Sequence, residues 1–426
     1  MPWKWKSVVV KSDRLSAPVV ASYRVRKMEN YIKAEERWVT AVNDGPTLRI
    51  FNPGHDIALA SGLTNFTPPH AARGLQADLG YLPALWANED DAVLVEDRSY
   101  AERTYLRLSA RLERLGLRPS CDVNFVTRKD LHSLCPVAVD PWGWDPALRH
   151  LLERHGVEER CLPSVGYVGE VRRLSHRANA AELLRRLVPS GDGGSGCGRL
   201  VGCAHTARSM DEVRRFLGET GRAVLKAPWS SSGRGVRFVD GALSGHQEGW
   251  AANVLKTQGA LMVEPHYRKV CDFGMEFVSD AQGRVCYQGL SLFTTVNGAY
   301  TGNLLATERV KRAVLSRYVD GALLDEVAQR ICRMLSMPLS DGNGGDDGHH
   351  YVYEGPFGVD MMVVARDDED GFLLHPCVEI NLRRTMGHVA LAISPDDDDN
   401  RRVMSIVSFN GGYKLLVNRA SRLGVD

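Results

Sequence analysis

The sequence is poor in the features that mark nucleic-acid-binding and membrane proteins. Its formal net charge is only +1, so no basic surface for nucleic acid is expected. It contains no run of roughly 20 apolar residues, the length that a membrane helix needs, and its N-terminus lacks the apolar segment of a secretory signal. We therefore expect a cytoplasmic protein without nucleic-acid or membrane partners.

The usual cysteine and nucleotide motifs are also absent. The nine cysteines form no Cys-x-x-Cys pair, and we expect reduced, structural thiols. Neither a Walker loop nor a Rossmann fingerprint occurs, so the commonest nucleotide-binding motifs are excluded. With 426 residues, of which 44% are hydrophobic, the chain can bury one large core or two to three smaller ones.

The distribution of apolar residues predicts the domain order. Residues 1–46 carry many basic residues but no helix caps or turn signals, and we expect a disordered N-terminal extension. From Leu48, strand-like runs alternate with amphipathic helical patterns, which predicts a parallel, Rossmann-like α/β domain over residues 47–163. The glycine-rich segments 189–198 and 340–350 are expected to be flexible linkers.

A lysine at the end of an apolar strand is the first indication of a binding site. Ala223 to Lys226 reads as a buried strand, and its lysine needs an anionic partner because an unpaired charge is costly to bury. The loop that follows offers hydroxyls and backbone N–H groups that could cradle phosphates. A flexible hairpin tip with a solvated lysine fits this segment equally well. The loop residues are Ser230, Ser231, Ser232, Gly233, Arg234 and Gly235.

A pair of carboxylates near the C-terminus is the second indication. Two apolar strands flank the turn at residues 366–371, and folding this hairpin about its turn is expected to place Asp360 opposite Glu379, with Asn381 on the same face. Carboxylate and amide oxygens are ligands that suit Mg²⁺. The alternative is a carboxylate pair on a solvated face. Arg383 would share the face of Asn381, and its guanidinium could bind phosphoryl oxygens or a substrate carboxylate.

Between these two signals, an apolar strand turns abruptly polar. Val263 and Glu264 end this strand, and Asp272 follows shortly after. Such a transition can present backbone groups and carboxylates to an adenine edge and a ribose.

Taken in order, these segments resemble the ATP-grasp superfamily over residues 165–410. The resemblance implies that ATP is held between two α+β subdomains, placed here at residues 164–258 and 259–426, and that the last hairpin carries the metal ligands Asp360, Glu379 and Asn381. Mg²⁺ is the implied metal, with Mn²⁺ as an alternative. The implied nucleotide-binding residues are Arg177, Lys226, Ser230, Ser231, Ser232, Gly233, Arg234, Gly235, Val263, Glu264 and Asp272.

The resemblance further implies a carboxylate–amine ligase that forms an acyl phosphate from a small-molecule or peptide carboxylate and passes it to an amine. Lys226 and Arg383 are the implied catalytic cations. A phosphotransferase and a non-catalytic Mg-ATP-binding module remain as alternatives, and a homodimer is the commonest soluble assembly.

Substrate contacts are expected from two places. Asn52, Gly54, His55 and Asp56 occupy a strand-to-helix turn, where Asp56 could equally cap the helix. Further acceptor-side candidates are Gln288 to Ser291, Tyr300 to Asn303, Arg384 and His388.

Overall fold

The structure is a computed structural model that describes residues 45–117, 122–188, 199–230, 235–296, 299–336, 352–366 and 371–419. Several predicted features lie outside the described residues. They are most of the N-terminal extension (residues 1–44), the linkers at 189–198 and 340–350, and the loop residues Ser231, Ser232, Gly233 and Arg234.

The N-terminal domain is built around a parallel sheet with the strand order β3-β2-β1-β4. Leu48 and Ile50 of β1 pack with helix α5 on one face, and Phe51 and Val93 pack with helices α3 and α4 on the other. Both faces of the sheet are covered, and β2 is apolar throughout, while the buried Arg49 of β1 is paired with Asp91 and Asp140. The elements are β1 (Thr47–Ile50), α2 (His55–Ser61), α3 (His70–Leu79), the 3₁₀ helix η1 (Leu82–Leu85), β2 (Ala92–Leu94), α4 (Arg98–Arg114), β3 (Asn124–Val126), η2 (Leu131–Ser133), β4 (Ala138–Pro141), α5 (Pro146–Arg154) and η3 (Glu159–Cys161).

A small antiparallel sheet with the order β5-β8-β6-β7 follows, and the apolar faces of α8 and α9 cover it. A capping box between Ser244 and Gln247 fixes the start of α9. Strand β8 pairs with β5 and β6, so the sheet extends beyond the domain boundary expected at residue 258. The elements are α6 (Val165–Leu174), α7 (Arg177–Leu187), β5 (His205–Ala207), α8 (Met210–Thr220), β6 (Arg222–Lys226), β7 (Val236–Asp240), α9 (Gly245–Gln258) and β8 (Leu261–Pro265).

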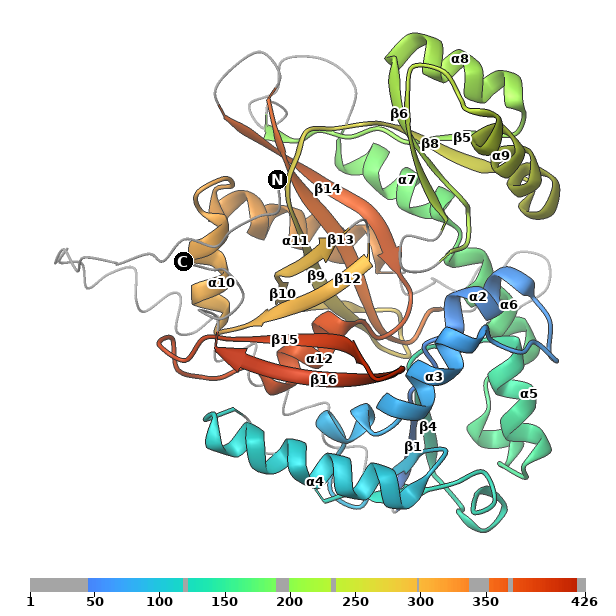
Figure 1. Ribbon diagram of the computed structural model, residues 1–426, viewed down its shortest axis with the longest axis vertical. Coiled ribbons are helices and arrows are strands. Elements are labelled where there is room, and N and C mark those ends of the chain that lie inside the picture. Colours follow the sequence, from blue (N-terminus) through green and yellow to red (C-terminus); the bar gives the residue numbers. More distant parts are fainter. Residues whose placement is uncertain are drawn as a thin grey trace, which may run out of the picture.

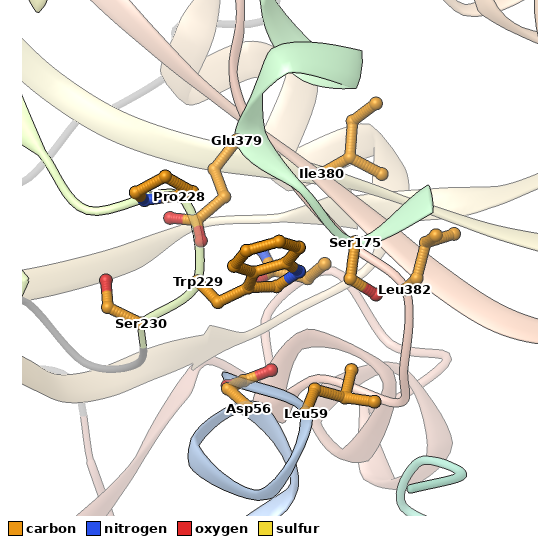
Figure 2. A pocket seen from close by; sticks show the side chains of 10 residues that line it. Asp56, Leu59, Ser175, Pro228, Trp229, Ser230, Glu379, Ile380 and Leu382 are labelled. Carbon is orange, nitrogen blue, oxygen red and sulfur yellow. The ribbon is translucent and has the colours of Figure 1, made fainter. Parts of the chain in front are cut away.

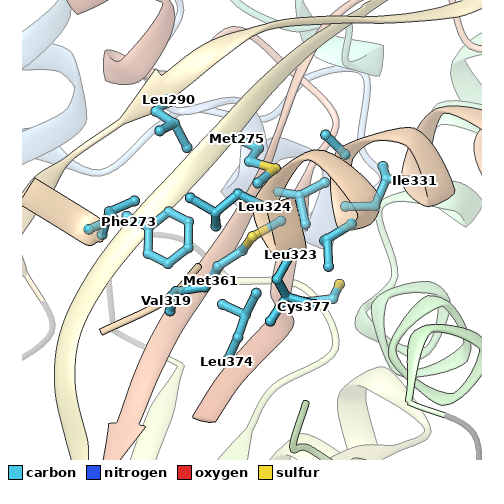
Figure 3. Packing of buried hydrophobic residues seen from close by; sticks show 14 of the residues in the cluster. Phe273, Met275, Leu290, Val319, Leu323, Leu324, Ile331, Met361, Leu374 and Cys377 are labelled. Carbon is cyan, nitrogen blue, oxygen red and sulfur yellow. The ribbon is translucent and has the colours of Figure 1, made fainter. Parts of the chain in front are cut away.

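The central sheet is antiparallel, with the order β10-β9-β13-β14. Its two faces differ because side chains alternate along each strand. One face is apolar and packs against helices α7, α10 and α11, and Figure 3 shows Phe273, Met275 and Met361 beside Leu323 and Leu324 of α11. The other face carries the acidic residues of β9 and β13. The elements are β9 (Lys269–Ser279), β10 (Val285–Ser291), α10 (Glu308–Leu315), α11 (Gly321–Leu335), β13 (Gly355–Ala365) and β14 (Phe372–Asn381).

A fourth sheet, with the order β11-β12-β15-β16, joins the C-terminal half to the N-terminal domain (Figure 1). Leu305, Met404 and Val417 from this sheet and Val389 from α12 share a core with the N-terminal helices. The two halves of the chain are therefore held together by a buried apolar interface. The elements are β11 (Phe293–Val296), β12 (Ala299–Leu305), α12 (Met386–Ile393), β15 (Arg402–Phe409) and β16 (Gly412–Arg419).

These sheets confirm the predicted fold class, a parallel α/β domain followed by two α+β subdomains. Figure 1 shows the small sheet with α8 and α9 at the top right and the N-terminal domain at the lower right, with the central sheet to the left of both. Within the described ranges, no helix is long and apolar enough to cross a membrane.

Candidate nucleotide and metal site

The predicted pairing of Asp360 with Glu379 is present, but it depends on an irregularity in the hairpin. At the turn Ala365 pairs with Phe372, and a register shift between Asp360 and Met362 then displaces one strand relative to the other. A regular hairpin closed at Ala365 and Phe372 would place Cys377, not Glu379, opposite Asp360. The β-bulge therefore brings the two carboxylates together, a common use of bulges near functional sites.

Asp360 lies among other negatively charged groups. Burial raises its pKa to about 8, and the nearby carboxylates of Glu379 and Glu276 act in the same direction. Asn381 Nδ2 donates a hydrogen bond of 3.1 Å to Asp360 Oδ2, which partly offsets these effects. A buried carboxylate in such a field is stabilised in its charged form by a cation.

The oxygen atoms of the side chains at this position are suitable ligands for a hard divalent cation. Asp360 of β13 and Glu379 and Asn381 at the end of the paired strand β14 offer oxygen atoms here, and the Glu379 side chain is 28% exposed and accessible to a ligand. In the described part of the chain, no three His, Cys, Asp or Glu side chains converge closely enough to hold a metal alone. Phosphate or water oxygens would have to complete the coordination.

Arg177 links this hairpin to the base of the serine–glycine loop. It is the first residue of α7 and is 7% exposed. Its Nη2 lies 2.6 Å from Glu379 Oε1, and its Nη1 donates to Ala227 O at 2.5 Å and to Ser230 Oγ at 2.6 Å. The predicted phosphate-binding arginine therefore contacts both a predicted metal ligand and the base of the loop.

Ser230 and Gly235 close the base of the same loop. Ala227 N donates to Gly235 O at 2.8 Å, which continues the pairing of β6 with β7. A Cβ atom at Gly235 would collide with the Ser230 side chain, so the close approach requires glycine.

Lys226 has an anionic partner, as the sequence required, and that partner is Glu264. The Lys226 Nζ lies 2.6 Å from Glu264 Oε2, and both side chains are only 9% exposed. The two residues share a face because Lys226 pairs with Met262, two positions before Glu264. Val263 points to the other face, into the core of the small sheet, so only its backbone could meet a ligand.

Asp272 lies on the polar face of the central sheet, opposite Met362 of β13. It accepts hydrogen bonds from Lys269 Nζ at 2.6 Å and from Thr295 Oγ1 at 3.0 Å. These partners belong to β9 and β11, not to the strand pair that carries Lys226 and Glu264. Its predicted contact with a ribose stays a prediction.

Arg383 faces the N-terminal domain. Its Nε donates to both carboxylate oxygens of Asp56, at 2.9 and 3.0 Å, and its two terminal nitrogens donate to Arg384 O and Asn381 Oδ1, each at 3.2 Å. Although burial acts to raise the pKa of Asp56, Arg383 and His55 hold it well below its usual value. All the donor nitrogens of Arg383 thus have protein partners, and its predicted contact with phosphoryl oxygens or a substrate carboxylate stays a prediction.

For the strand-to-helix turn of the N-terminal domain, two roles were expected: substrate contact, or capping of the helix by Asp56. The structure excludes the capping role. Gly54 is the N-cap of α2, and no side chain caps this helix, so Asp56 is not a cap. His55 is 1% exposed and lies within hydrogen-bond distance of Trp144 O, so it is not a surface residue. Asn52 donates to Gly143 O at 2.8 Å and ties β1 to the loop after β4.

A pocket with about 310 Å³ of empty space, part of it open to solvent, lies where these elements meet. Figure 2 shows Asp56 and Leu59 from α2, Trp229 and Ser230 from the loop base, and Glu379 from β14 around it. It brings together residues from four regions that are far apart in the sequence. The lining residues are Asp56, Leu59, Ser175, Pro228, Trp229, Ser230, Glu379, Ile380, Asn381 and Leu382.

Several of the residues expected on the acceptor side lie together in a buried network of polar side chains. At its centre is Glu276, a residue that was not predicted to belong to the site. Thr385 Oγ1 donates to Glu276 Oε2 at 2.8 Å, and His388 Nδ1 lies 3.0 Å from the same oxygen. Asn303 Nδ2 donates to Ser291 Oγ at 2.8 Å, and a Cβ at Gly387 would collide with both Glu276 and Ser291. The alternation Asp272, Gly274, Glu276 in the sequence was the signal that these positions share one face.

The chain has distant structural similarity to proteins of solved structure. No family model and no curated protein matches the sequence. The N5-carboxyaminoimidazole synthetase from Staphylococcus aureus, complexed with ADP, matches over 85% of this chain and 82% of that chain, with 12% identity and a TM-score of 0.44. A biotin carboxylase complex with β-γ-ATP from Campylobacter jejuni matches over 84% of this chain and 75% of that chain, with 14% identity and a TM-score of 0.41.

At identities of 12–14% and TM-scores below 0.5, these similarities identify neither a family nor a substrate for this chain.

Proposed function

We propose that this protein is an ATP-dependent ligase that activates a carboxylate as an acyl phosphate and joins it to an amine, with release of ADP and phosphate. The observation that carries the proposal is the placement of Asp360, Glu379 and Asn381 at the end of one hairpin, directly linked by Arg177 to the base of the serine–glycine loop. Metal ligands and a phosphate-binding loop must meet in this way if one nucleotide is to contact both.

Asp360, Glu379 and Asn381 would hold Mg²⁺, or Mn²⁺ in its place, together with nucleotide phosphates. The bound metal supplies positive charge that stabilises the negative charge on the transferring phosphoryl group. The bulge in the hairpin would hold the two carboxylates opposite each other on either side of the metal.

Lys226 and Arg177 would supply fixed positive charge to the phosphates. Each is buried and already bound to a carboxylate, Lys226 to Glu264 and Arg177 to Glu379. Nucleotide binding would exchange a protein carboxylate for a phosphate, so neither cation is left unpaired in either state. Glu264 and the backbone of Val263 would then face the nucleoside, and Asp272 the ribose.

The pocket beside Glu379 would exclude water from the acyl phosphate. Pro228, Trp229, Leu59 and Leu382 give it apolar walls, and an acyl phosphate survives only where water is kept out. The loop from Ser230 to Gly235 would close over the phosphates, as such loops do in enzymes with labile intermediates.

The test is a screen of carboxylic acids and amines for ADP release, followed by hydroxylamine trapping of the acyl phosphate. Asp360→Asn and Glu379→Gln should abolish Mg²⁺-dependent ADP formation while the protein stays folded. Glu182→Gln is the matched control, because Glu182 forms an exposed ion pair with Arg185 on the far side of α7 from the site. Unchanged ADP formation in both site variants would contradict the proposal.

The same assay separates the two alternatives. A phosphotransferase would release ADP but give no hydroxamate, and a non-catalytic module would bind Mg-ATP without substrate-dependent ADP release.

A further inference from the structure

An unbroken series of polar contacts runs from the N-terminal domain to the candidate metal site. Arg383 Nε contacts Asp56, Arg383 Nη2 donates to Asn381 Oδ1 at 3.2 Å, and Asn381 Nδ2 donates to Asp360 Oδ2 at 3.1 Å. The first residue of this series belongs to helix α2 and the last to strand β13, more than 300 positions later in the chain. The amide of Asn381 is thus oriented by an arginine whose own position depends on another domain.

Asp56 is held firmly on the other side as well. His55 Nδ1 lies 3.3 Å from Asp56 Oδ1, while His55 Nε2 lies 3.0 Å from Trp144 O. A Cβ atom at Gly143 would lie 2.6 Å from the His55 ring and 2.9 Å from Arg383 Cβ, so the loop after β4 packs directly against both residues. This packing leaves Asp56 and Arg383 little freedom to move separately.

We infer that Asp56 is a positioning residue for the metal site: through Arg383 it fixes the side chain of Asn381, so that the N-terminal domain completes the affinity of the hairpin for a divalent cation. This inference rests on the proposed function, because it takes Asp360, Glu379 and Asn381 as the metal ligands. Groups that orient metal ligands by hydrogen bonds commonly contribute about 10- to 100-fold to metal affinity. Asp56 also lines the pocket beside Glu379 and Asn381, which places it at the same site.

A second ion pair between the same domains serves as a control. It separates an effect on the metal site from a general loosening of the contact between the domains. Arg384, next to Arg383, pairs with Asp140 of β4 at 3.1 Å, and the exposed fractions of this pair, 14% and 23%, match those of Arg383 and Asp56, 16% and 20%. Arg384 lies over the ring of Trp86 and does not share the contact with Asn381. Loss of Asp140 therefore removes a comparable link between the domains, together with the pair that Asp140 forms with Arg49 of β1, without touching the metal ligands.

The experiment is calorimetric titration of ADP into the full-length protein, with excess EDTA and with saturating Mg²⁺. The measured quantity is the gain in ADP affinity that Mg²⁺ produces, compared among the wild type, Asp56→Ala, Asp140→Ala and Arg383→Lys. We expect this gain to fall about 10- to 100-fold in Asp56→Ala and to be retained in Asp140→Ala. Affinity in EDTA should change little in either.

Arg383→Lys keeps the charge and can still pair with Asp56, but an ammonium group cannot contact Asp56 and Asn381 in the same fork geometry. It is expected to lose the Mg²⁺-dependent gain even if Asp56→Ala proves too unstable to purify. Thermal unfolding of each variant reports the loss of the domain link itself.

An unchanged Mg²⁺-dependent gain in Asp56→Ala or in Arg383→Lys would overturn the inference, and so would equal losses in Asp56→Ala and Asp140→Ala. In those cases the wild type still shows the gain, and the proposed function stands. A wild type without any Mg²⁺-dependent gain would instead remove the metal site, and the proposed function and the inference would fall together.

Discussion

Acidification should destabilise this protein through one buried histidine, His375 of β14. Its side chain is fully buried, and neither ring nitrogen has a hydrogen-bond partner. Burial lowers its pKa from the usual 6.5 to about 3, and the positive charge of Lys226 acts in the same direction. The folded protein therefore holds His375 neutral at pH values where the unfolded chain binds a proton.

The sign and size of the effect follow from these two pKa values. Above pH 6.5 His375 is neutral in both states and contributes nothing to pH dependence. Below 6.5 the unfolded state gains a proton that the folded state does not, so stability falls with pH until about 3. Between pH 7.5 and 5.0 this amounts to about 2 kcal/mol, since one pH unit corresponds to roughly 1.36 kcal/mol.

Urea unfolding at pH 7.5 and 5.0 measures this effect. The His375→Leu variant should lose about 2 kcal/mol less than the wild type over this interval, because all other titrating groups are common to both proteins. The same substitution at the exposed His246 controls for the removal of a histidine. Identical losses in the wild type and His375→Leu would refute the reasoning.

Two further predictions concern the cations of the site. Lys226→Ala should weaken ATP binding at least tenfold, about 1.4 kcal/mol, because it removes a buried phosphate partner; calorimetry measures this, and equal affinity would exclude Lys226 from the site. Arg177→Met should lower the free energy of unfolding by about 1.5–3 kcal/mol, the range for a hydrogen bond to a charged group, because it releases both Glu379 and the loop base. Urea unfolding tests this, and full stability would show that the contacts of Arg177 with Glu379 and the loop base do not stabilise the fold.

Much of the site could be predicted from the sequence because its signals are local. Lys226 needed an anionic partner, and the apolar strands flanking a polar turn defined the hairpin of Asp360 and Glu379. Their exact opposition was less secure, since regular pairing from the turn would have brought Cys377 to that place, and the bulge near Met362 leaves no clear mark in the sequence.

The partners of the charged residues could not be predicted, because they come from distant segments. Nothing local indicates that Arg177 binds Glu379, that Lys226 binds Glu264, or that Arg383 is held by Asp56. Such contacts depend on how separate sheets pack against one another. The spacing of apolar residues along the sequence contains no information about this packing. The same reason explains why β8, which follows a helix of the small subdomain, was assigned to the next unit although it pairs with β6.

The most direct test of the account is a crystal structure of the full chain with a non-hydrolysable ATP analogue and Mn²⁺, whose anomalous signal locates the metal. The account predicts an anomalous peak within coordination distance of Asp360, Glu379 and Asn381, with the phosphates beneath the loop from Ser230 to Gly235. A peak elsewhere, or a nucleotide bound away from this hairpin, would contradict it.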